Sequence, residues 1–305
     1  MKHNELQIDY WKAGNRMKIS DYEYQQGNFK IKEVSTKPKK LLTKDEAEKH
    51  VQKRMKEFAK DQEMLFARHH YGLIIVLQAM DAAGKDSLVN HVFKGITPAG
   101  FQVASFKQPN SIDLRHDFLW RVNAQLPERG KIGIFNRSYY EDVLISRVHP
   151  EILLNANLPG IHRLDDINES FYQTRYRDIC NYERYLTHCG YVILKFFLHV
   201  SKDEQKKRFI ARIEEKNKNW KFSSADIRER GFWNQYQDAY QRAINATASV
   251  ENPWYVLPAD DKWTCRAIFS DILLARISQL PLSYPRVSAE EENNLEKAYA
   301  ELKKD

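Results

Sequence analysis

The chain has 305 residues, of which 42% are hydrophobic and 29% are charged, and its formal net charge at pH 7 is +7. This balance excludes an intrinsically disordered chain, and the length is enough for one large α/β domain with appendages or for two small domains. The positive charge favours an anionic partner, a class that includes nucleic acid, acidic lipid and phosphate-rich small molecules, and it does not choose among them.

Cysteine usage and hydropathy predict a cytoplasmic protein. The three cysteines, Cys180, Cys189 and Cys265, form no C-x-x-C motif, which indicates a reducing compartment and no structural zinc site. The most apolar run, residues 191–200, is ten residues long and contains a lysine, so we expect no membrane span. Residues 1–14 are too polar for a signal peptide.

The chain begins with a polar segment, residues 1–40, which ends in a basic cluster. We expect it to form an irregular arm that wraps the body or a neighbouring subunit. A helix is predicted next, because Thr43 and Glu46 form a capping box and apolar residues then recur at helical spacing through Leu65. The expected N-terminal unit, arm and helix, covers residues 1–65.

Five apolar runs predict strands, and they lie at residues 73–77, 100–106, 131–135, 191–200 and 254–257. The intervening segments have helical patterns, most clearly at 114–126 and 167–189, and a last helix of the core runs to about residue 280. Unbroken apolar strands separated by helices are typical of a parallel sheet covered on both faces. We therefore expect an α/β core over residues 66–280 and a charged helical tail over 281–305.

The first strand runs into the motif Ala-Met-Asp-Ala-Ala-Gly-Lys at residues 79–85, and helix-forming residues follow. A helix N-terminus binds anions through free N–H groups and the macrodipole, and Lys85 adds a mobile cation. The spacing matches the phosphate-loop pattern, except that Ala79 replaces its first glycine and Asp86 replaces the Ser or Thr that holds magnesium. The alternative is that Gly84 and Lys85 form a helix C-cap or an ordinary turn. The strand before and the helix after the motif favour the phosphate loop.

Carboxylates in this loop point to a divalent cation, because Asp81 and Asp86 would repel bound phosphates unless a cation lay between them. In a parallel sheet, ligands bind at the carboxyl ends of the strands. The third strand ends there in Asn136 and Arg137, whose guanidinium suits bidentate phosphate contacts. The alternative is a surface loop in which Arg137 and Glu141, four residues apart, form an ordinary helix pair.

A charged segment after the fourth strand, residues 201–246, carries Lys206, Lys207 and Arg208 at helical spacing. It reads equally well as a solvated helix face or as a lid, at about residues 204–235, that excludes water from phosphoryl transfer. The local pattern alone predicts that Arg121 is solvated and packs on the neighbouring Trp120.

These segments resemble the polyphosphate kinase 2 family, and more closely its branch of polyphosphate:AMP/ADP phosphotransferases. The matching stretches are residues 78–86, 117–121, 133–143, 148–150, 194–202 and 258–263. The combination is specific, whereas any single stretch is not. The resemblance implies a thymidylate-kinase-like phosphate-loop fold with a helical lid, a dependence on Mg²⁺ for which Mn²⁺ can substitute, and a homodimer or homotetramer.

The resemblance also implies roles for single residues. By matching position, the catalytic residues are Asp81, Lys85, Arg137 and Glu141, with Asp81 and Glu141 holding the metal. The implied phosphate- and polyphosphate-binding residues are Ala82, Ala83, Gly84, Lys85, Asp86, Arg121, Arg137, Lys206, Lys207 and Arg208. The implied nucleotide-binding residues are Asn136, Arg137 and Glu141. An asparagine at position 136 is similar to the branch that accepts both AMP and ADP, since ADP-specific relatives tend to have aspartate. No role is carried onto Tyr139 and Tyr140.

The sequence therefore predicts Mg²⁺-dependent, reversible phosphoryl transfer from inorganic polyphosphate to AMP or ADP, and also to GMP or GDP, with no membrane or nucleic-acid partner. Two alternatives stay open. One is an ATP-dependent nucleoside monophosphate kinase on the same fold. The other is a non-catalytic polyanion-binding protein, which Asp81 and Asp86 disfavour because a pure phosphate binder gains nothing from carboxylates.

Overall fold

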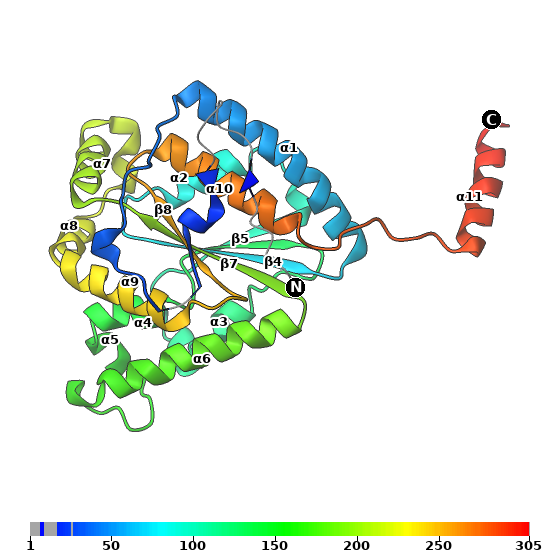
Figure 1. The fold of residues 1–305 in the computed structure, drawn as a ribbon. Coiled ribbons are helices and arrows are strands. Elements are labelled where there is room, and N and C mark those ends of the chain that lie inside the picture. The colour runs from blue at the N-terminus through cyan, green and yellow to red at the C-terminus, as the bar shows by residue number, and fades with distance from the viewer. Residues whose placement is uncertain (1–6, 9–16, 26, 305) are drawn as a thin grey trace.

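The computed structural model describes residues 7–8, 17–25 and 27–304. A six-stranded sheet in the order β3-β8-β7-β4-β6-β5 forms its centre (Figure 1). Its strands are β3 (Glu23–Tyr24), β4 (Gly72–Ala79), β5 (Phe101–Ser105), β6 (Ile132–Asn136), β7 (Tyr191–His199) and β8 (Trp254–Pro258). Strands β4 to β8 are parallel, as predicted, and β3 joins β8 as an antiparallel edge strand.

Helices cover both faces of the sheet (Figure 1). One face carries α1 (Lys44–Arg68), α2 (Lys85–Val92) and α10 (Lys262–Ile277). The other carries α3 (Trp120–Asn123), α4 (Glu141–Val148), α6 (Glu169–His188) and α9 (Trp233–Thr247). Every residue of β4 is buried, which explains why its sequence is apolar throughout instead of alternating.

The predicted start of α1 is confirmed. The Thr43 hydroxyl accepts from the Glu46 amide, and the Glu46 carboxylate accepts from the Thr43 amide, so both halves of the capping box form. The buried face of α1 includes Val51, Met55 and Phe58. This face packs against α10, on the same side of the sheet.

The N-terminal arm wraps the body of its own chain, in the part of the arm that the structure describes. Beyond strand β3, the Phe29 amide donates to the Asn245 side chain on α9 at 2.7 Å, and Asn245 donates back to the Phe29 carbonyl at 2.9 Å. Further along, the Thr36 hydroxyl donates to Asp260 at 2.8 Å. In the described residues between 17 and 40 the arm is largely irregular and contacts the body, as expected. Most of residues 1–16 lies outside the described part.

The helix expected at residues 114–126 is wrong. The structure has only a short 3₁₀ turn, Asp113–Arg115, and the four-residue α3. The Asp117 carboxylate accepts from the Leu119 amide at 2.9 Å, and such a local side-chain bond competes with helical backbone pairing. The segment is therefore a compact loop, and it forms one wall of a pocket described below.

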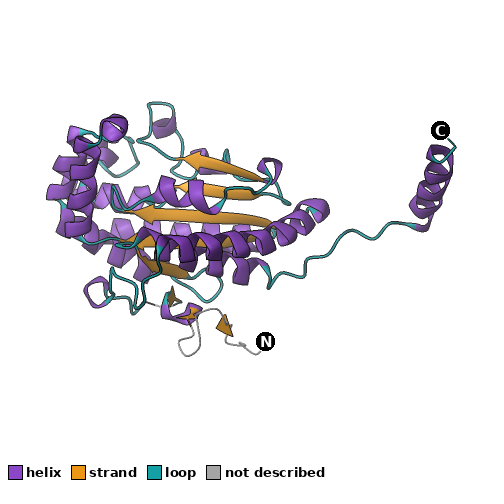
Figure 2. Cartoon of the chain, turned by 90° about the horizontal axis from the view of Figure 1, so that it is seen from above, coloured by secondary structure: helices purple, strands orange, loops and turns teal. Residues whose placement is uncertain are grey.

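The charged tail forms α11 (Ala289–Leu302), as predicted, and it begins with a capping box at Ser288. The helix lies apart from the body at the end of an extended segment (Figure 2). None of its residues is buried. Across the described ranges, no helix has both the length and the apolar character that a membrane span requires.

Candidate active site

The phosphate-loop motif forms the predicted strand, turn and helix. Strand β4 ends at Ala79 and helix α2 begins at Lys85. In the turn between them, Ala82 and Gly84 both have left-handed backbones, with φ of +61° and +110°. Glycine adopts this conformation freely, whereas alanine there costs roughly 1 kcal/mol, so the turn needs support from outside itself.

Arg208, on helix α7 (Lys202–Glu214), provides that support. Its Nη1 donates to the carbonyls of Ala82 and Ala83 at 3.2 and 2.6 Å. Its Nη2 donates to the carbonyls of Ala259 and Asp260, just past β8, at 2.6 and 3.3 Å. The sequence predicted Arg208 as a cation for polyphosphate. In the structure its guanidinium joins α7 to two loops at the edge of the sheet, and the side chain also lines the basic pocket described below.

Arg137 lies where the sequence placed it, at the end of β6 beside the phosphate loop. Its Nη2 donates to Asp81 Oδ1 at 2.9 Å, and its backbone has a φ of +64°. The charge of Glu141 raises the pKa of Arg137 against the effect of burial, so this side chain is a permanent cation. Lys85 Nζ donates to the Ala79 carbonyl at 3.0 Å. Burial and the nearby Arg137 lower the pKa of Lys85, while Asp81 and Glu141 oppose that shift.

Glu141 opens helix α4 and completes a cluster of two cations and two carboxylates. Burial raises the pKa of Glu141, and Arg137 and Lys85 counteract the shift. Gln78 supports the carboxylate from β4: with its amide oriented to satisfy its surroundings, its nitrogen donates to Glu141 Oε1 at 2.9 Å. The structure thus brings together all four residues that the sequence proposed for catalysis, from two separate loops.

A basic pocket lies on one side of this cluster. It is lined by residues 81–88 of the phosphate loop and α2, by Lys107 and by cationic side chains from two other regions. From α7 and the 3₁₀ helix that follows it (Lys216–Lys221) come Arg208, Arg212, Lys218 and Lys221; from α10 come Lys262 and Arg266. Such a row of cations suits a linear polyanion.

A second pocket lies on the other side, and its lining is mixed. Apolar and aromatic residues, among them Phe118, Ile152, Leu153 and Tyr240, share its wall with several carboxylates and arginines. Asp142 and Arg175 form an ion pair of 3.1 Å in this wall, and burial raises the pKa of Asp142 to about 6. Apolar surface with a few placed polar groups is typical of small-molecule sites.

The two pockets meet at Asp81 and Arg137, which line both. Phe106, Lys107 and Gln108, just past β5, are also shared. The two pockets are therefore contiguous beside the cluster of Asp81, Lys85, Arg137 and Glu141.

Several predicted binding residues lie elsewhere. Lys206 and Lys207 are exposed on α7 and line neither pocket. Arg121 lines the mixed pocket, where it donates to the Lys107 carbonyl at 2.6 Å. Asn136, expected on the nucleotide, lines the basic pocket and donates to Asp86 at 2.5 Å. Helical spacing alone could not show which side of α7 faces the phosphate loop.

The sequence reasoning missed Lys262 and Arg266 as cations of the basic pocket. Both lie on the first turns of α10, where Arg266 also donates to the Ser87 hydroxyl at 2.7 Å. A signal was present, because Lys262 belongs to the matching stretch 258–263 directly after a predicted strand.

The donor set at this site fits Mg²⁺ only with help from a ligand. Among the described residues there is no group of three or more side chains of the metal-binding types His, Cys, Asp and Glu. Asp81 and Glu141 supply carboxylate oxygens, which suit Mg²⁺, and Mg²⁺ commonly takes its remaining ligands from substrate phosphates and water. The cluster therefore fits a metal that arrives with a phosphate ligand and does not fit an all-protein cage.

Comparisons with known proteins agree on one family. The family model described as Polyphosphate kinase 2 (PPK2) matches residues 41–282. A Rhodopseudomonas palustris protein named ADP-polyphosphate phosphotransferase is 45% identical over 276 residues, which cover 89% of this chain and 94% of that protein. A Meiothermus ruber protein named AMP/ADP-polyphosphate phosphotransferase is 43% identical, covering 74% of this chain and 79% of its own.

A solved structure gives the same answer for the fold. The crystal structure of polyphosphate kinase 2 from Arthrobacter aurescens TC1 superposes with a TM-score of 0.78 at 36% identity. The match covers 88% of this chain and 92% of the other. The predicted phosphate-loop α/β fold is thereby confirmed.

Proposed function

The chain belongs to the polyphosphate kinase 2 family, and we propose that it moves the terminal phosphoryl group of inorganic polyphosphate onto AMP or ADP. The enzyme class, a polyphosphate:nucleotide kinase, follows from the family and from the names of its relatives. The observation that carries the site assignment is the meeting of a basic and a mixed pocket at Asp81 and Arg137. Polyphosphate would occupy the first pocket and the nucleotide the second.

Transfer needs no strong base, because the acceptor is an ionised phosphate oxygen. That oxygen forms a new P–O bond to the terminal phosphorus of polyphosphate while the bond to the bridging oxygen breaks. The shortened chain leaves as an anion, and one phosphoanhydride replaces another, so the reaction is reversible. Catalysis then depends on alignment of the two ends and on neutralisation of their charge.

The cluster residues divide this work. Lys85 and Arg137 would neutralise the transferring phosphoryl group, whose negative charge is spread over three oxygens. Asp81 and Glu141 would hold Mg²⁺, or Mn²⁺ in its place, and the bound ion would supply further positive charge for the phosphate ligands. The helices from α7 to α8 (Ser224–Gly231) would act as a lid that excludes water, since hydrolysis competes with transfer.

The decisive experiment offers AMP, ADP, GMP and GDP separately to the purified protein with polyphosphate and Mg²⁺, without ATP. ADP and then ATP should form from AMP. A protein that makes ADP from AMP only when ATP is supplied would instead be an ATP-dependent monophosphate kinase. Salt-sensitive polyphosphate binding without any product would point to a non-catalytic polyanion binder. Either result would contradict the proposal.

Asn136 bears on the choice between AMP and ADP as acceptors. Asn136 donates to Asp86 and lines the basic pocket, which supports a role through the phosphate loop and not on the base. Asn136→Asp sets two carboxylates side by side and should lower the AMP rate more than the ADP rate. An equal loss of rate with both acceptors would show that Asn136 does not influence the choice between AMP and ADP.

A further inference from the structure

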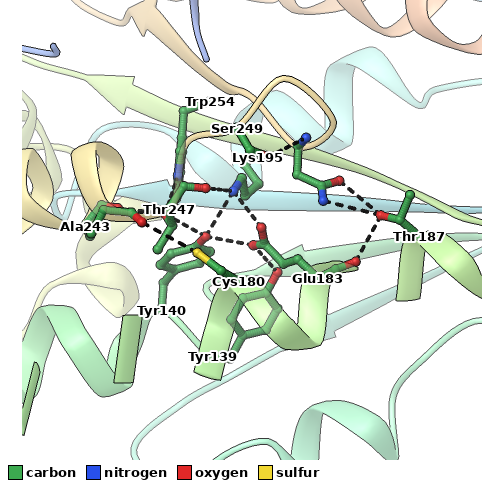
Figure 3. Close-up of polar contacts among 12 residues, drawn as sticks. Tyr139, Tyr140, Cys180, Glu183, Thr187, Lys195, Ala243, Thr247, Ser249 and Trp254 are labelled. Atoms are coloured by element: carbon green, nitrogen blue, oxygen red, sulfur yellow. Dashed lines mark hydrogen bonds and ion pairs between the residues drawn. The ribbon is translucent and has the colours of Figure 1, made fainter. Parts of the chain in front are cut away.

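A buried polar network lies behind the loop that carries Arg137 and Glu141 (Figure 3). Tyr139 and Tyr140, the two residues in that loop for which the sequence suggested no role, are both buried. Their hydroxyls converge on one oxygen of Glu183, Oε1, at 2.8 and 2.7 Å. Burial and the charge of Glu183 raise the pKa of both tyrosines well above the ordinary value, so both stay protonated donors.

Lys195, on β7, completes the network (Figure 3). Its Nζ donates to Glu183 Oε2 at 2.7 Å, to the Thr247 carbonyl at 2.7 Å and to the Tyr140 hydroxyl at 3.2 Å, which uses all three ammonium protons. The side chains of Glu183 and Lys195 are 2% and 0% exposed. The pair therefore joins α6, β7 and the last residue of α9 to the loop after β6.

A buried ion pair is a poor way to gain stability, because desolvation of two charges offsets most of their attraction, and apolar residues of similar volume commonly do as well. The contacts of this pair suggest what it does instead. Arg137 needs a left-handed backbone, and the two residues after Ser138 are the ones fixed to Glu183. Neither Glu183 nor Lys195 lines the two pockets.

The network also reaches helix α9, which lines part of the mixed pocket. Tyr236 and Tyr240 line that pocket and lie on α9, whose terminal residue, Thr247, accepts from Lys195. The Thr247 hydroxyl in turn accepts from Trp254 Nε1 at 2.9 Å, on β8. One buried cluster thus contacts both the loop with Arg137 and Glu141 and the end of helix α9.

We propose that Glu183 and Lys195 are positioning residues for phosphoryl transfer: through Tyr139 and Tyr140 they hold Arg137 and Glu141 against Asp81, at a fixed distance from α9. This inference rests on the proposed function. It assigns a catalytic purpose to a charge pair that touches no substrate. Small displacements of groups that align reactants can lower the rate by up to ~100-fold. Removal of the Glu183–Lys195 pair should therefore lower kcat.

The test is a double variant, Glu183→Leu with Lys195→Met, which removes both charges and leaves neither one unpaired. Its melting temperature should fall, because the buried Tyr139 hydroxyl and Thr247 carbonyl lose their partners, so kcat is measured at a temperature where the variant is shown to be folded. Its kcat for AMP and polyphosphate should fall at least ~10-fold, with KM for both substrates within ~3-fold. Amide hydrogen exchange at residues 137–141 should become faster, while exchange in α1 and α10 is unchanged.

The control is a second buried ion pair. Arg54 on α1 and Asp271 on α10 lie 2.7 Å apart with side chains 7% and 0% exposed, on the opposite face of the sheet. Arg54→Met with Asp271→Leu should keep kcat within ~2-fold of the parent, whatever it does to the melting temperature.

Two single variants keep the proposal testable if the double variant does not fold. Tyr139→Phe and Tyr140→Phe each delete one hydroxyl that reaches Glu183, and each should lower kcat at least ~3-fold without changing KM. A parent-like kcat in a folded double variant, or in both tyrosine variants, would overturn the positioning role. The activity of the parent protein tests the proposed function separately, so the two failures can be told apart.

Discussion

Lys85 and Lys206 are both lysines of the proposed polyphosphate-binding set, yet only Lys85 lies in the basic pocket. Lys85→Ala should lower kcat at least ~100-fold, since removal of one preorganised group that stabilises developing charge typically costs that much. Lys206→Ala, an exposed surface change, should stay within ~2-fold of the parent. Initial rates of ADP formation from AMP measure both. Comparable losses in the two variants would mean that the polyphosphate path runs over the outer side of α7.

Asp81 contacts Arg137 and is proposed to hold the metal. Asp81→Asn keeps the shape of the side chain but removes its charge. The Mg²⁺ concentration that gives half-maximal rate should therefore rise at least ~10-fold. Loss of a metal ligand, or of a residue that supports one, commonly weakens metal binding by that much. Titration of the rate with Mg²⁺ and with Mn²⁺ provides the measurement. An unchanged metal dependence would show that Asp81 does not hold the metal.

His199, at the end of β7, is buried beside Asp260, and burial lowers the pKa of His199 to about 4. The unfolded chain therefore binds more protons than the folded one between pH 6.5 and 4, so the free energy of unfolding falls as the pH falls through that window. The difference in pKa corresponds to roughly 3 kcal/mol at most. His199→Gln should flatten this part of the pH profile, measured by urea unfolding at pH 7 and pH 5. Parallel profiles for the two proteins would contradict the assignment.

At the scale of elements, Arg208 joins α7 to the phosphate loop and to the end of β8 through four carbonyl groups. A lysine cannot reproduce this planar, forked pattern. Arg208→Lys should therefore lower the free energy of unfolding by about 2 kcal/mol and lower kcat together with it. Arg228→Lys, an exposed change on α8, should alter neither. Chemical denaturation and initial rates test this; a parent-like Arg208→Lys protein would show that the loop holds its shape alone.

The sequence predicted elements where the local pattern and the tertiary environment agree. The five parallel strands and the capping box of α1 are such cases, because unbroken apolar runs and Thr43 with Glu46 act locally. The helix expected at 114–126 failed because the Asp117 side chain bonds to the backbone, which periodicity does not register.

The candidate site was predictable only in part, for a related reason. The two loops that meet at Asp81 and Arg137 follow from the rule that parallel strands place their carboxyl ends together. The orientation of α7 does not, since Lys206, Lys207 and Arg208 are adjacent in sequence and only Arg208 turns inward. The role of Lys195 was hidden as well, because a lysine in an apolar strand acquires its partner, Glu183, from another helix.

At the scale of the whole molecule, helix α11 lies apart from the rest of the chain (Figure 2). The family match ends at residue 282, and α11 has no buried residue. A chain that stops after Arg286 should keep kcat within ~2-fold and its melting temperature within ~2 °C, since no packed surface is lost. Kinetics and calorimetry on the truncated protein check this. A large loss of kcat or of melting temperature would show that the tail contributes to the active protein.

The expected homodimer or homotetramer stays a prediction for the full chain. Sedimentation of the full-length and truncated proteins would measure the assembly state and show whether α11 contributes to it. Identical assembly in both would leave the body surface as the place of contact between subunits.

The remote position of α11 has a practical consequence for biocatalysis. Both pockets open on the edge of the sheet where the phosphate loop lies, whereas the tail leads the chain away from the body (Figure 2). An ATP-consuming enzyme fused behind this helix would leave the pocket mouths unobstructed. The extended segment before α11 would serve as a ready-made spacer, so that the nucleotide released by one partner could be used by the other at short range.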